Sequence, residues 1–428
     1  MRKKYLCFVL IFLVILSAQS SQGLYQNKQL INKNNMNATN QDIIHMINQI
    51  NHTILFQYLE KIVSFGIRHV GSENCRKAAE YIHEEFQNLG LDSYIDSWRY
   101  PRYKCQNVVA THHGTDLTSD IVFVLTAHLD TINVSVGAND DGSGVAALLT
   151  LARIFSRYTF NHTIKFVIVS GHEVGEYGSF DYAKKAYASN ENILANINVD
   201  MIGNSTCGHI IQAFTPERSQ HLYYYSDEIN KKYENYIDMQ MQLSAHYPVD
   251  SQSFVDYGYD AISFIQPKVF EYPFHTLEDN LEKINFPYFE NVTKLILAIT
   301  AELASKKIDL QVRFVTPKEG YIYLLKWPIL KLPGLNLHGI RAMTYLLGRT
   351  IAKVNIITQE EILGVTYVID GNADYSSILY EPPYEWKMQK PFYELFRLRG
   401  KHRLSVYVYT NTGKSASDEM DFFVLTSI

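Results

Sequence analysis

Histidines and carboxylates recur across the middle of the 428-residue sequence in short segments, some of which also contain glycine. The residues there that could bind a metal ion or carry a proton are His128, Asp130, Asp140, His172, Glu173, Asp200 and His275. Imidazole nitrogen and carboxylate oxygen are ligands that zinc accepts at about 2.0 to 2.2 Å. A single His or Asp is more often an ordinary hydrogen-bonded group or a helix cap. The hypothesis of a metal site therefore depends on the fold bringing these residues together.

Segments with the character of strands precede most of these residues. Apolar runs predict strands at 121–126, 163–170, 193–201 and 260–265. Segments of helical character lie at 72–90, 144–156, 179–190 and 278–306. Strands that alternate with helices predict an α/β fold with a mostly parallel central sheet, covered on both faces. Ligands of such sheets bind beyond the carboxyl ends of the strands, and His128, His172 and Asp200 fall there.

Five motifs make the chain resemble the M28 family of zinc exopeptidases from about Phe65 to about Leu303. They are His-x-Asp, Gly-Ala-x-Asp-x-x-Ser-Gly, Glu-x-Gly-x-x-Gly-Ser, Asn-x-Asp-Met and His-Thr-x-x-Asp, in family order. The resemblance implies a three-layer α/β sandwich of the zinc exopeptidase type that holds two Zn²⁺ ions. It implies that His128 and Asp200 bind one zinc, that Glu173 and His275 bind the other, and that Asp140 bridges them. Asp130 would fix the tautomer of His128.

One position departs from the family pattern. The family's general base is a glutamate directly before the glutamate ligand, and this sequence has His172 there. A neutral imidazole can accept a proton, so His172 can serve as the catalytic base, although two nearby dications lower the pKa of an imidazole. Glu176 is a second candidate for the base. The third interpretation is a domain that binds metal with little or no activity.

A further segment, Asp250-Ser-Gln-Ser-Phe254, also resembles a family segment. The histidine that often follows its aspartate in the family is Ser251 here.

After about Lys307 the pattern changes to aromatic and β-branched runs separated by turn signals such as Asp370-Gly371. Such runs include 321–325, 365–369 and 404–409, and they predict a β-sandwich. This part resembles immunoglobulin-like domains, with Trp386 as an expected core residue. The expected organisation is a signal peptide at 1–23, a polar linker at 24–45, a zinc peptidase domain at 46–307 and an immunoglobulin-like β-sandwich at 308–428.

The amino terminus has basic residues, an apolar run and then small residues, which is typical of a secretory signal. In an exported protein, six Asn-x-Ser/Thr sequons could carry N-linked glycans. They lie at Asn37, Asn51, Asn133, Asn161, Asn204 and Asn291. Export also allows oxidation of one cysteine pair, for which Cys75 and Cys105 are the first choice over the alternative of buried free thiols.

The formal net charge of −5 gives no basic excess for binding nucleic acid. Contact with a membrane is expected only if the signal stays uncleaved. The expected partner is a peptide or protein substrate.

These features together predict a secreted, glycosylated di-zinc metallopeptidase that hydrolyses terminal peptide bonds, in the first instance as an aminopeptidase. The alternative is a non-catalytic binding or adhesion protein that retains metal.

Overall fold

The computed structural model describes residues 39–100, 102–117, 119–216, 219–244, 249–306, 310–318, 320–331, 344–347, 350–358, 360–388 and 400–426. The chain divides into two compact units between residues 306 and 307. The predicted signal peptide lies outside the described residues. Among the helices that are described, none is long and apolar enough to cross a membrane.

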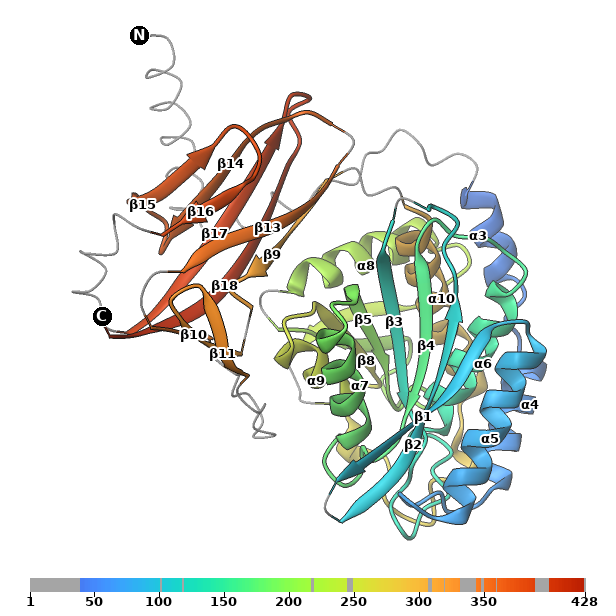
Figure 1. Ribbon diagram of the computed structural model, residues 1–428. Coiled ribbons are helices and arrows are strands. Elements are labelled where there is room, and N and C mark those ends of the chain that lie inside the picture. Colours follow the sequence, from blue (N-terminus) through green and yellow to red (C-terminus); the bar gives the residue numbers. More distant parts are fainter. Residues whose placement is uncertain are drawn as a thin grey trace. The chain divides into compact units, whose positions relative to one another are not determined.

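A mixed eight-stranded sheet forms the centre of the first unit (Figure 1). Its strands are β1 (Asp92–Tyr100), β2 (Tyr103–His112), β3 (Ile121–His128), β4 (Thr163–Val169), β5 (Asn192–Val199), β6 (Ile210–Phe214), β7 (Gln240–Ser244) and β8 (Ala261–Ile265). They lie in the order β1-β2-β4-β3-β5-β8-β6-β7. The neighbours β4, β3, β5 and β8 are parallel, so their carboxyl ends share one edge of the sheet. The predicted α/β class with a mostly parallel sheet is confirmed.

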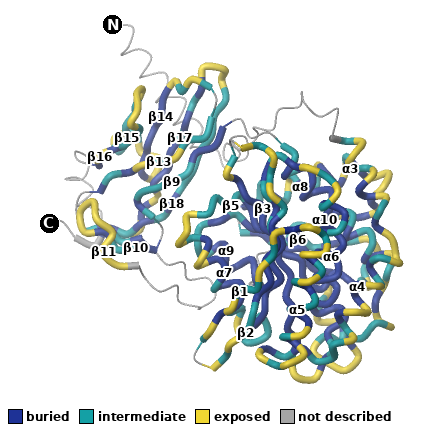
Figure 2. The backbone as a smooth tube through the Cα atoms, turned by 45° about the vertical axis from the view of Figure 1, so that its right-hand side comes forward, coloured by how far each residue is buried: buried dark blue, intermediate teal, exposed yellow. Residues whose placement is uncertain are grey.

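Helices cover both faces of this sheet. They are α3 (Thr39–Ile47), α4 (His52–Ser64), α5 (Glu73–Asn88), α6 (Gly142–Phe155), α7 (Tyr177–Ala188), α8 (Gln220–Lys232), α9 (Asp250–Asp256) and α10 (Phe286–Ser305), with the 3₁₀ turns η3 (Val269–Glu271) and η4 (Leu281–Lys283). Figure 1 shows α4, α5 and α6 on one side of the sheet and α7 and α9 on the other. Every residue of β3 is buried, which explains its continuous apolar run. The dark blue strands in Figure 2 mark this core.

The second unit consists of two sheets that share one hydrophobic core. Its strands are β9 (Leu310–Thr316), β10 (Tyr321–Leu324), β11 (Trp327–Lys331), β12 (Thr344–Leu347), β13 (Ile351–Thr358), β14 (Ile362–Ile369), β15 (Asn372–Leu379), β16 (Glu385–Lys387), β17 (Gly400–Thr410) and β18 (Ser415–Thr426). Seven form the sheet β11-β10-β12-β18-β17-β14-β15, and three form β16-β13-β9. Trp386 of the smaller sheet packs in one cluster with Tyr367 and Leu404 of the larger one. The predicted β-rich unit is therefore present.

The structure differs from the sequence-based prediction at the start of the first unit. Residues 39–45, which fall in the predicted polar linker, belong to α3. Ile43, Met46 and Ile47 recur at three- and four-residue spacing and are buried, and α3 packs against α10. This short apolar stripe is hard to recognise in the sequence because Asn and Gln residues surround it.

Candidate metal centre

The ends of neighbouring parallel strands bring the predicted residues to one edge of the sheet. β3 ends at His128, and Asp200 directly follows β5. β4 leads into the loop with Glu173, Asp140 lies between β3 and α6, and His275 lies between η3 and η4. These residues are far apart in the sequence, but the shared direction of the strands makes them neighbours.

The five predicted ligands form one cluster with Asp140 at its centre. The Nε2 atom of His128 lies 3.1 Å from Oδ1 of Asp140 and 3.7 Å from Oδ1 of Asp200. On the other side, Nε2 of His275 lies 3.3 Å from Oδ2 of Asp140 and 2.9 Å from Oε2 of Glu173. The two oxygens of Asp140 therefore face two different imidazoles, which is the arrangement of a bridging carboxylate.

Unpartnered buried atoms test whether these residues fit a metal. Within the described part of the chain, Nε2 of His128, Oε1 of Glu173 and Oδ1 of Asp200 have no hydrogen-bond partner. A buried polar atom without a partner costs free energy, and a divalent cation would satisfy imidazole and carboxylate atoms together. Two groups are compact enough to hold an ion, His128 with His172 and Asp200, and Asp140 with Glu173 and His275. The residues fit two zinc ions.

The cluster is buried on one side and open on the other. The side chains of His128, Asp140 and Asp200 are 0%, 6% and 8% exposed, whereas that of His275 is 43% exposed. Burial alone would lower the pKa of His128, but Asp140 and Asp200 outweigh it and raise the pKa. Hydrogen bonds that His275 donates to the carboxylates of Asp140 and Glu173 raise the pKa of His275 to about 10. Because the side chain of His275 is exposed, a substrate can reach the centre from that side.

The loops around the cluster contain non-glycine residues in the left-handed conformation. The φ angle is 58° at Glu176, 50° at Met201 and 60° at His275. Such a backbone costs on the order of 1 kcal/mol or more and persists where surrounding contacts impose it. Backbone strain thus coincides with the candidate metal centre.

The carboxylate of Asp130 organises the loop after β4. Its Oδ1 accepts the backbone N–H groups of Gly171 at 2.7 Å and His172 at 3.1 Å, and its Oδ2 accepts that of Glu173 at 3.2 Å. A φ of +82° at Gly171 helps these N–H groups converge, and a Cβ there would lie 2.7 Å from the ring of Trp98.

The tautomer of His128 is fixed by the backbone of Asp130. Nδ1 of His128 lies 3.0 Å from the carbonyl oxygen of Asp130 and 3.9 Å from its carboxylate. A carbonyl can only accept, so the proton is on Nδ1 and Nε2 is free to bind a metal. Asp130 is thus placed for the role that the resemblance implied, and it acts through its backbone carbonyl.

Asp141, which follows the predicted bridging residue Asp140, forms hydrogen bonds with three segments of the chain. Its carboxylate accepts the backbone N–H groups of His128 at 3.0 Å, Gly144 at 2.9 Å and Met201 at 3.1 Å. It thereby caps the amino end of α6 and joins it to the ends of β3 and β5. Gly144 is needed because a Cβ there would lie 2.5 Å from the Asp141 carboxylate. Sequence reasoning singled out Asp140 and passed over this supporting residue.

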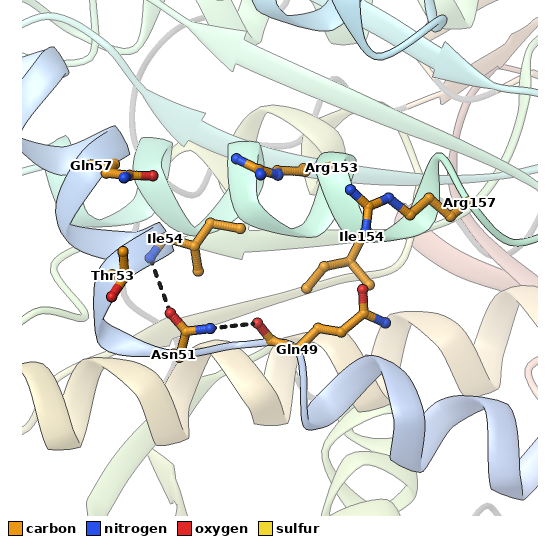
Figure 3. A pocket seen from close by; sticks show the side chains of 8 residues that line it. All are labelled: Gln49, Asn51, Thr53, Ile54, Gln57, Arg153, Ile154 and Arg157. Atoms are coloured by element: carbon orange, nitrogen blue, oxygen red, sulfur yellow. Dashed lines mark hydrogen bonds between the residues drawn. The ribbon is translucent and has the colours of Figure 1, made fainter.

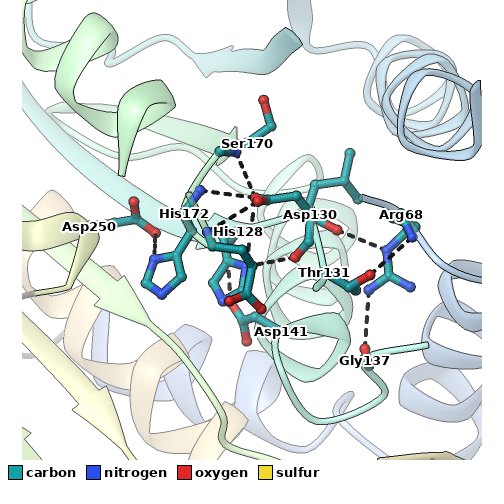
Figure 4. A network of polar contacts seen from close by, with 12 residues as sticks. Arg68, His128, Asp130, Thr131, Gly137, Asp141, Ser170, His172 and Asp250 are labelled. Atoms are coloured by element: carbon teal, nitrogen blue, oxygen red, sulfur yellow. Dashed lines mark hydrogen bonds and ion pairs between the residues drawn. The ribbon is translucent and has the colours of Figure 1, made fainter. Parts of the chain in front are cut away.

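Arg68 is a fully buried cation that supports the loop between His128 and Asp140. Its guanidinium donates to the carbonyl oxygens of Leu129 at 2.8 Å, Val136 at 2.7 Å and Gly137 at 3.1 Å. Figure 4 shows Arg68 beside the polar network that contains Asp130 and His128. No sequence motif marks this residue.

His172 lies between a carboxylate and a predicted metal ligand (Figure 4). Its Nδ1 is 3.0 Å from Oδ2 of Asp250, in the first turn of α9, and its ring stacks on that of His128 with centroids 4.0 Å apart and planes 7° apart. Burial and His128 would lower the pKa of His172, but Asp250 outweighs them and raises it to about 10. Glu176 belongs to neither of the two compact groups in the described chain.

A cavity of about 510 Å³ lies elsewhere in the same unit, between α4 and α6 (Figure 3). The residues that line it are Gln49, Asn51, Thr53, Ile54, Gln57, Arg153, Ile154 and Arg157. None of them is a candidate ligand, so this cavity is separate from the metal centre.

Comparisons with known proteins bear on the same segment. Residues 107–300 match the sequence profile of Peptidase family M28. The chain is 30% identical over 196 residues to "Probable zinc metalloprotease Lema_P086240" of Leptosphaeria maculans, covering 40% of this chain and 45% of that protein. It is 26% identical over 278 residues to "Leucine aminopeptidase 1" of Ajellomyces capsulatus, covering 58% of this chain and 70% of that protein. The chain thus spans less than half of the length of the first of these relatives.

Solved structures show the same fold. LapB of Legionella pneumophila has a TM-score of 0.57 at 21% identity and covers 63% of this chain and 76% of its own. The aminopeptidase from Aneurinibacillus sp. strain AM-1 has a TM-score of 0.55 at 16% identity and covers 62% of this chain and 97% of its own. This shared fold agrees with the family match and with the order of the motifs. The α/β unit of this chain is therefore similar to peptidase family M28, in the profile match over residues 107–300 and in its fold.

Proposed function

We propose that the protein is a secreted di-zinc aminopeptidase in which His172 acts as the catalytic base. The single observation that carries this proposal is the bridging geometry of Asp140, whose two oxygens lie 3.1 and 3.3 Å from Nε2 of His128 and of His275. When bound, the two zinc ions polarise the scissile carbonyl and the attacking water.

Five residues of the chain would bind the zinc ions, and a sixth, His172, would transfer protons. His128 and Asp200 would hold one zinc ion, Glu173 and His275 would hold the other, and Asp140 would contribute to both sites. His172 takes a proton from the attacking water at Nε2 and gives it to the leaving amine. The pKa of His172 is raised to about 10 in the zinc-free protein, and beside two bound dications it would fall toward the range in which a base works at neutral pH.

Attack at the amino end of a peptide is supported by the activity that the names of two relatives describe. Leucine aminopeptidase 1 and the Bacillus subtilis protein "Aminopeptidase YwaD", which is 26% identical over 214 residues, are both aminopeptidases by name. The expected substrate is therefore a peptide or protein with a free amino terminus.

Export rests on sequence features alone. The signal-like amino terminus and the sequons favour a secreted glycoprotein. The two-sheet architecture of the second unit, with Trp386 at its core, favours an immunoglobulin-like sandwich with a supporting or adhesive role.

Metal content and turnover, measured on one preparation, test the proposed activity. We expect about two zinc ions per chain and chelator-sensitive release of the leaving group from a panel of aminoacyl chromogenic substrates. His172→Glu restores the usual carboxylate and should keep activity or raise it, while His209→Glu, at an exposed histidine, should change nothing. Zinc without turnover in both the wild type and His172→Glu would remove the enzyme proposal.

The second candidate function is a metal-retaining binding or adhesion protein. It is favoured by the same replacement at position 172, because Asp250 raises the pKa of His172 to about 10, and an imidazole that is protonated on both nitrogens at neutral pH cannot accept another proton. If the wild type holds two zinc ions without turnover while His172→Glu gains activity, the natural protein has exchanged catalysis for binding.

A further inference from the structure

We infer that Asp250 is a positioning residue that holds His172 in the Nδ1–H tautomer and directs its Nε2 atom toward the metal centre. This inference rests on the proposed function for its catalytic meaning, but the arrangement itself stands on the geometry. No motif predicts the pair, because the two residues are 78 positions apart in the sequence.

The hydrogen bond determines which nitrogen carries the proton. Oδ2 of Asp250 lies 3.0 Å from Nδ1 of His172, and the Asp250 side chain is 1% exposed. A carboxylate accepts hydrogen bonds, so Nδ1 is the donor and carries the hydrogen. The neutral ring then has its lone pair on Nε2, which is the atom that can take a proton from water.

The backbone and the neighbouring ring determine where this atom points. Oδ1 of Asp130 holds the backbone N–H of His172 at 3.1 Å, and the ring lies flat against that of His128. Asp250 lies at the Nδ1 edge of the ring (Figure 4), and a ring nitrogen of His172 lies within 4.8 Å of ligand atoms of His128 and Asp200. With its side chain 19% exposed, His172 has little freedom to turn away.

The stacking also argues that His172 is not itself a ligand. The lone pair of an imidazole nitrogen lies in the plane of the ring, and the two rings are within 7° of parallel with centroids 4.0 Å apart. Parallel lone pairs in separate planes do not meet at one point. A nitrogen of His172 lies close to the ligand atoms of His128 and Asp200, but its ring orientation suits an approach to water or peptide better than a bond to the same ion.

In the reaction, Asp250 would act only through His172. As Nε2 forms its bond to the proton of the attacking water, the O–H bond of the water breaks and the ring becomes an imidazolium. The buried Asp250 carboxylate stabilises this positive charge through the Nδ1–H group. When Nε2 passes the proton to the leaving amine, the ring returns to its starting tautomer.

The first test reads the tautomer directly. Full-length, zinc-loaded protein labelled with ¹⁵N-histidine is examined by long-range ¹H–¹⁵N NMR, with the signal of His172 identified by its loss in His172→Gln. We expect a protonated Nδ1 and an unprotonated Nε2. A protonated Nε2, or an Nε2 that bears the signature of a zinc ligand together with a fall in zinc content in His172→Gln, would overturn the inference.

The second test measures coupling between the two residues. Asp250→Asn should shift the tautomer toward Nε2–H and lower kcat by about 10² to 10⁴-fold, with zinc content unchanged and KM within about threefold. Asp250→Glu, which keeps the acceptor, should recover part of the rate. Asp256→Asn, the same substitution at the other end of α9, serves as the control.

The His172→Glu background separates positioning from structural support. A carboxylate base at this position has no tautomer to be fixed, so Asp250→Asn should change kcat little in that background. An equal loss of kcat in the wild-type and His172→Glu backgrounds would contradict the inference. If the wild type shows no turnover but has the Nδ1–H tautomer, the proposed function fails while the positioning role of Asp250 stands.

Discussion

The carboxylate of Asp279 accepts the backbone N–H of Asp140 at 3.1 Å, across 139 residues of sequence. Its other oxygen accepts the backbone N–H of Asn139 at 2.7 Å and the hydroxyl of Tyr272 at 2.8 Å. Burial raises the pKa of Asp279 to about 6. Because His275 precedes it by only four residues, Asp279 links the segment with this predicted ligand to the backbone of Asp140, the predicted bridging residue.

Loss of the Asp279 carboxylate should weaken metal binding. Asp279→Asn keeps one acceptor but removes the second oxygen that holds the backbone of Asp140. We expect zinc affinity to fall by about 10 to 100-fold, the usual cost of losing a group that orients a ligand. Competition with a chromophoric chelator measures this. Glu278→Gln, at the exposed neighbouring carboxylate, is the control, and equal affinities for both variants would show that Asp279 does not position the bridge.

Zinc binding should strengthen as pH rises. Asp140 and Glu173 raise the pKa of His275 to about 10, so at pH 7 this imidazole carries a proton in the zinc-free protein. Zinc must displace that proton, and each displaced proton changes the affinity about tenfold per pH unit below the pKa of the group. Affinity should therefore fall as pH falls from about 8.5 to about 6.5. Titration calorimetry in buffers of different ionisation enthalpy counts the released protons.

A variant at His275 provides the check on this pH dependence. His275→Ala should release about one proton fewer per chain on loading with zinc. If the wild-type affinity were the same at both ends of this pH range, the protons would not compete with the metal at this histidine.

Substitution of Arg68 should destabilise the first unit. Arg68→Lys keeps the charge but loses the planar guanidinium group, whose N–H groups donate to the carbonyl oxygens of Leu129, Val136 and Gly137. Buried acceptors left without partners cost about 1 to 3 kcal/mol each. We expect a loss of about 3 kcal/mol and a Tm lower by roughly 6 to 12 °C, measured by calorimetry. Arg76→Lys, in exposed ion pairs, should shift Tm by less than about 2 °C.

The sequence singled out the residues that gather in the cluster better than the residues that support them, for a physical reason. His128 and Asp200 follow apolar strands, and a parallel sheet necessarily gathers such strand ends at one edge. Arg68 and Asp141 act through hydrogen bonds to segments distant in sequence, and Asp250, although it lies in a segment that resembles the family, pairs with a histidine 78 positions away. Such contacts leave no local pattern. The roles of these residues follow only from the coordinates.

The same distinction applies to secondary structure. The buried strand β3 is evident in the sequence as a continuous apolar run, whereas the hairpin of β1 and β2 begins with a polar, half-exposed strand. Pairing between antiparallel strands, such as that of Asp92 with Thr111, depends on register, and the composition of either strand does not reveal it.

Oxidation should join Cys75 to Cys105 and stabilise the first unit. Their Sγ atoms lie 3.6 Å apart as free thiols, and a hydrogen bond from Cys75 lowers the pKa of Cys105 to about 6, so its reactive thiolate is present at neutral pH. Closing this loop of about 30 residues should add about 3.5 kcal/mol. Protein from an oxidising compartment should have a mass lower by two hydrogen atoms and a higher Tm than its reduced form. Cys207→Ser, which keeps both cysteines of the pair, should show the same two differences. Cys105→Ser should abolish both effects, and an unchanged Tm on reduction of the wild type would mean that the thiols remain unpaired.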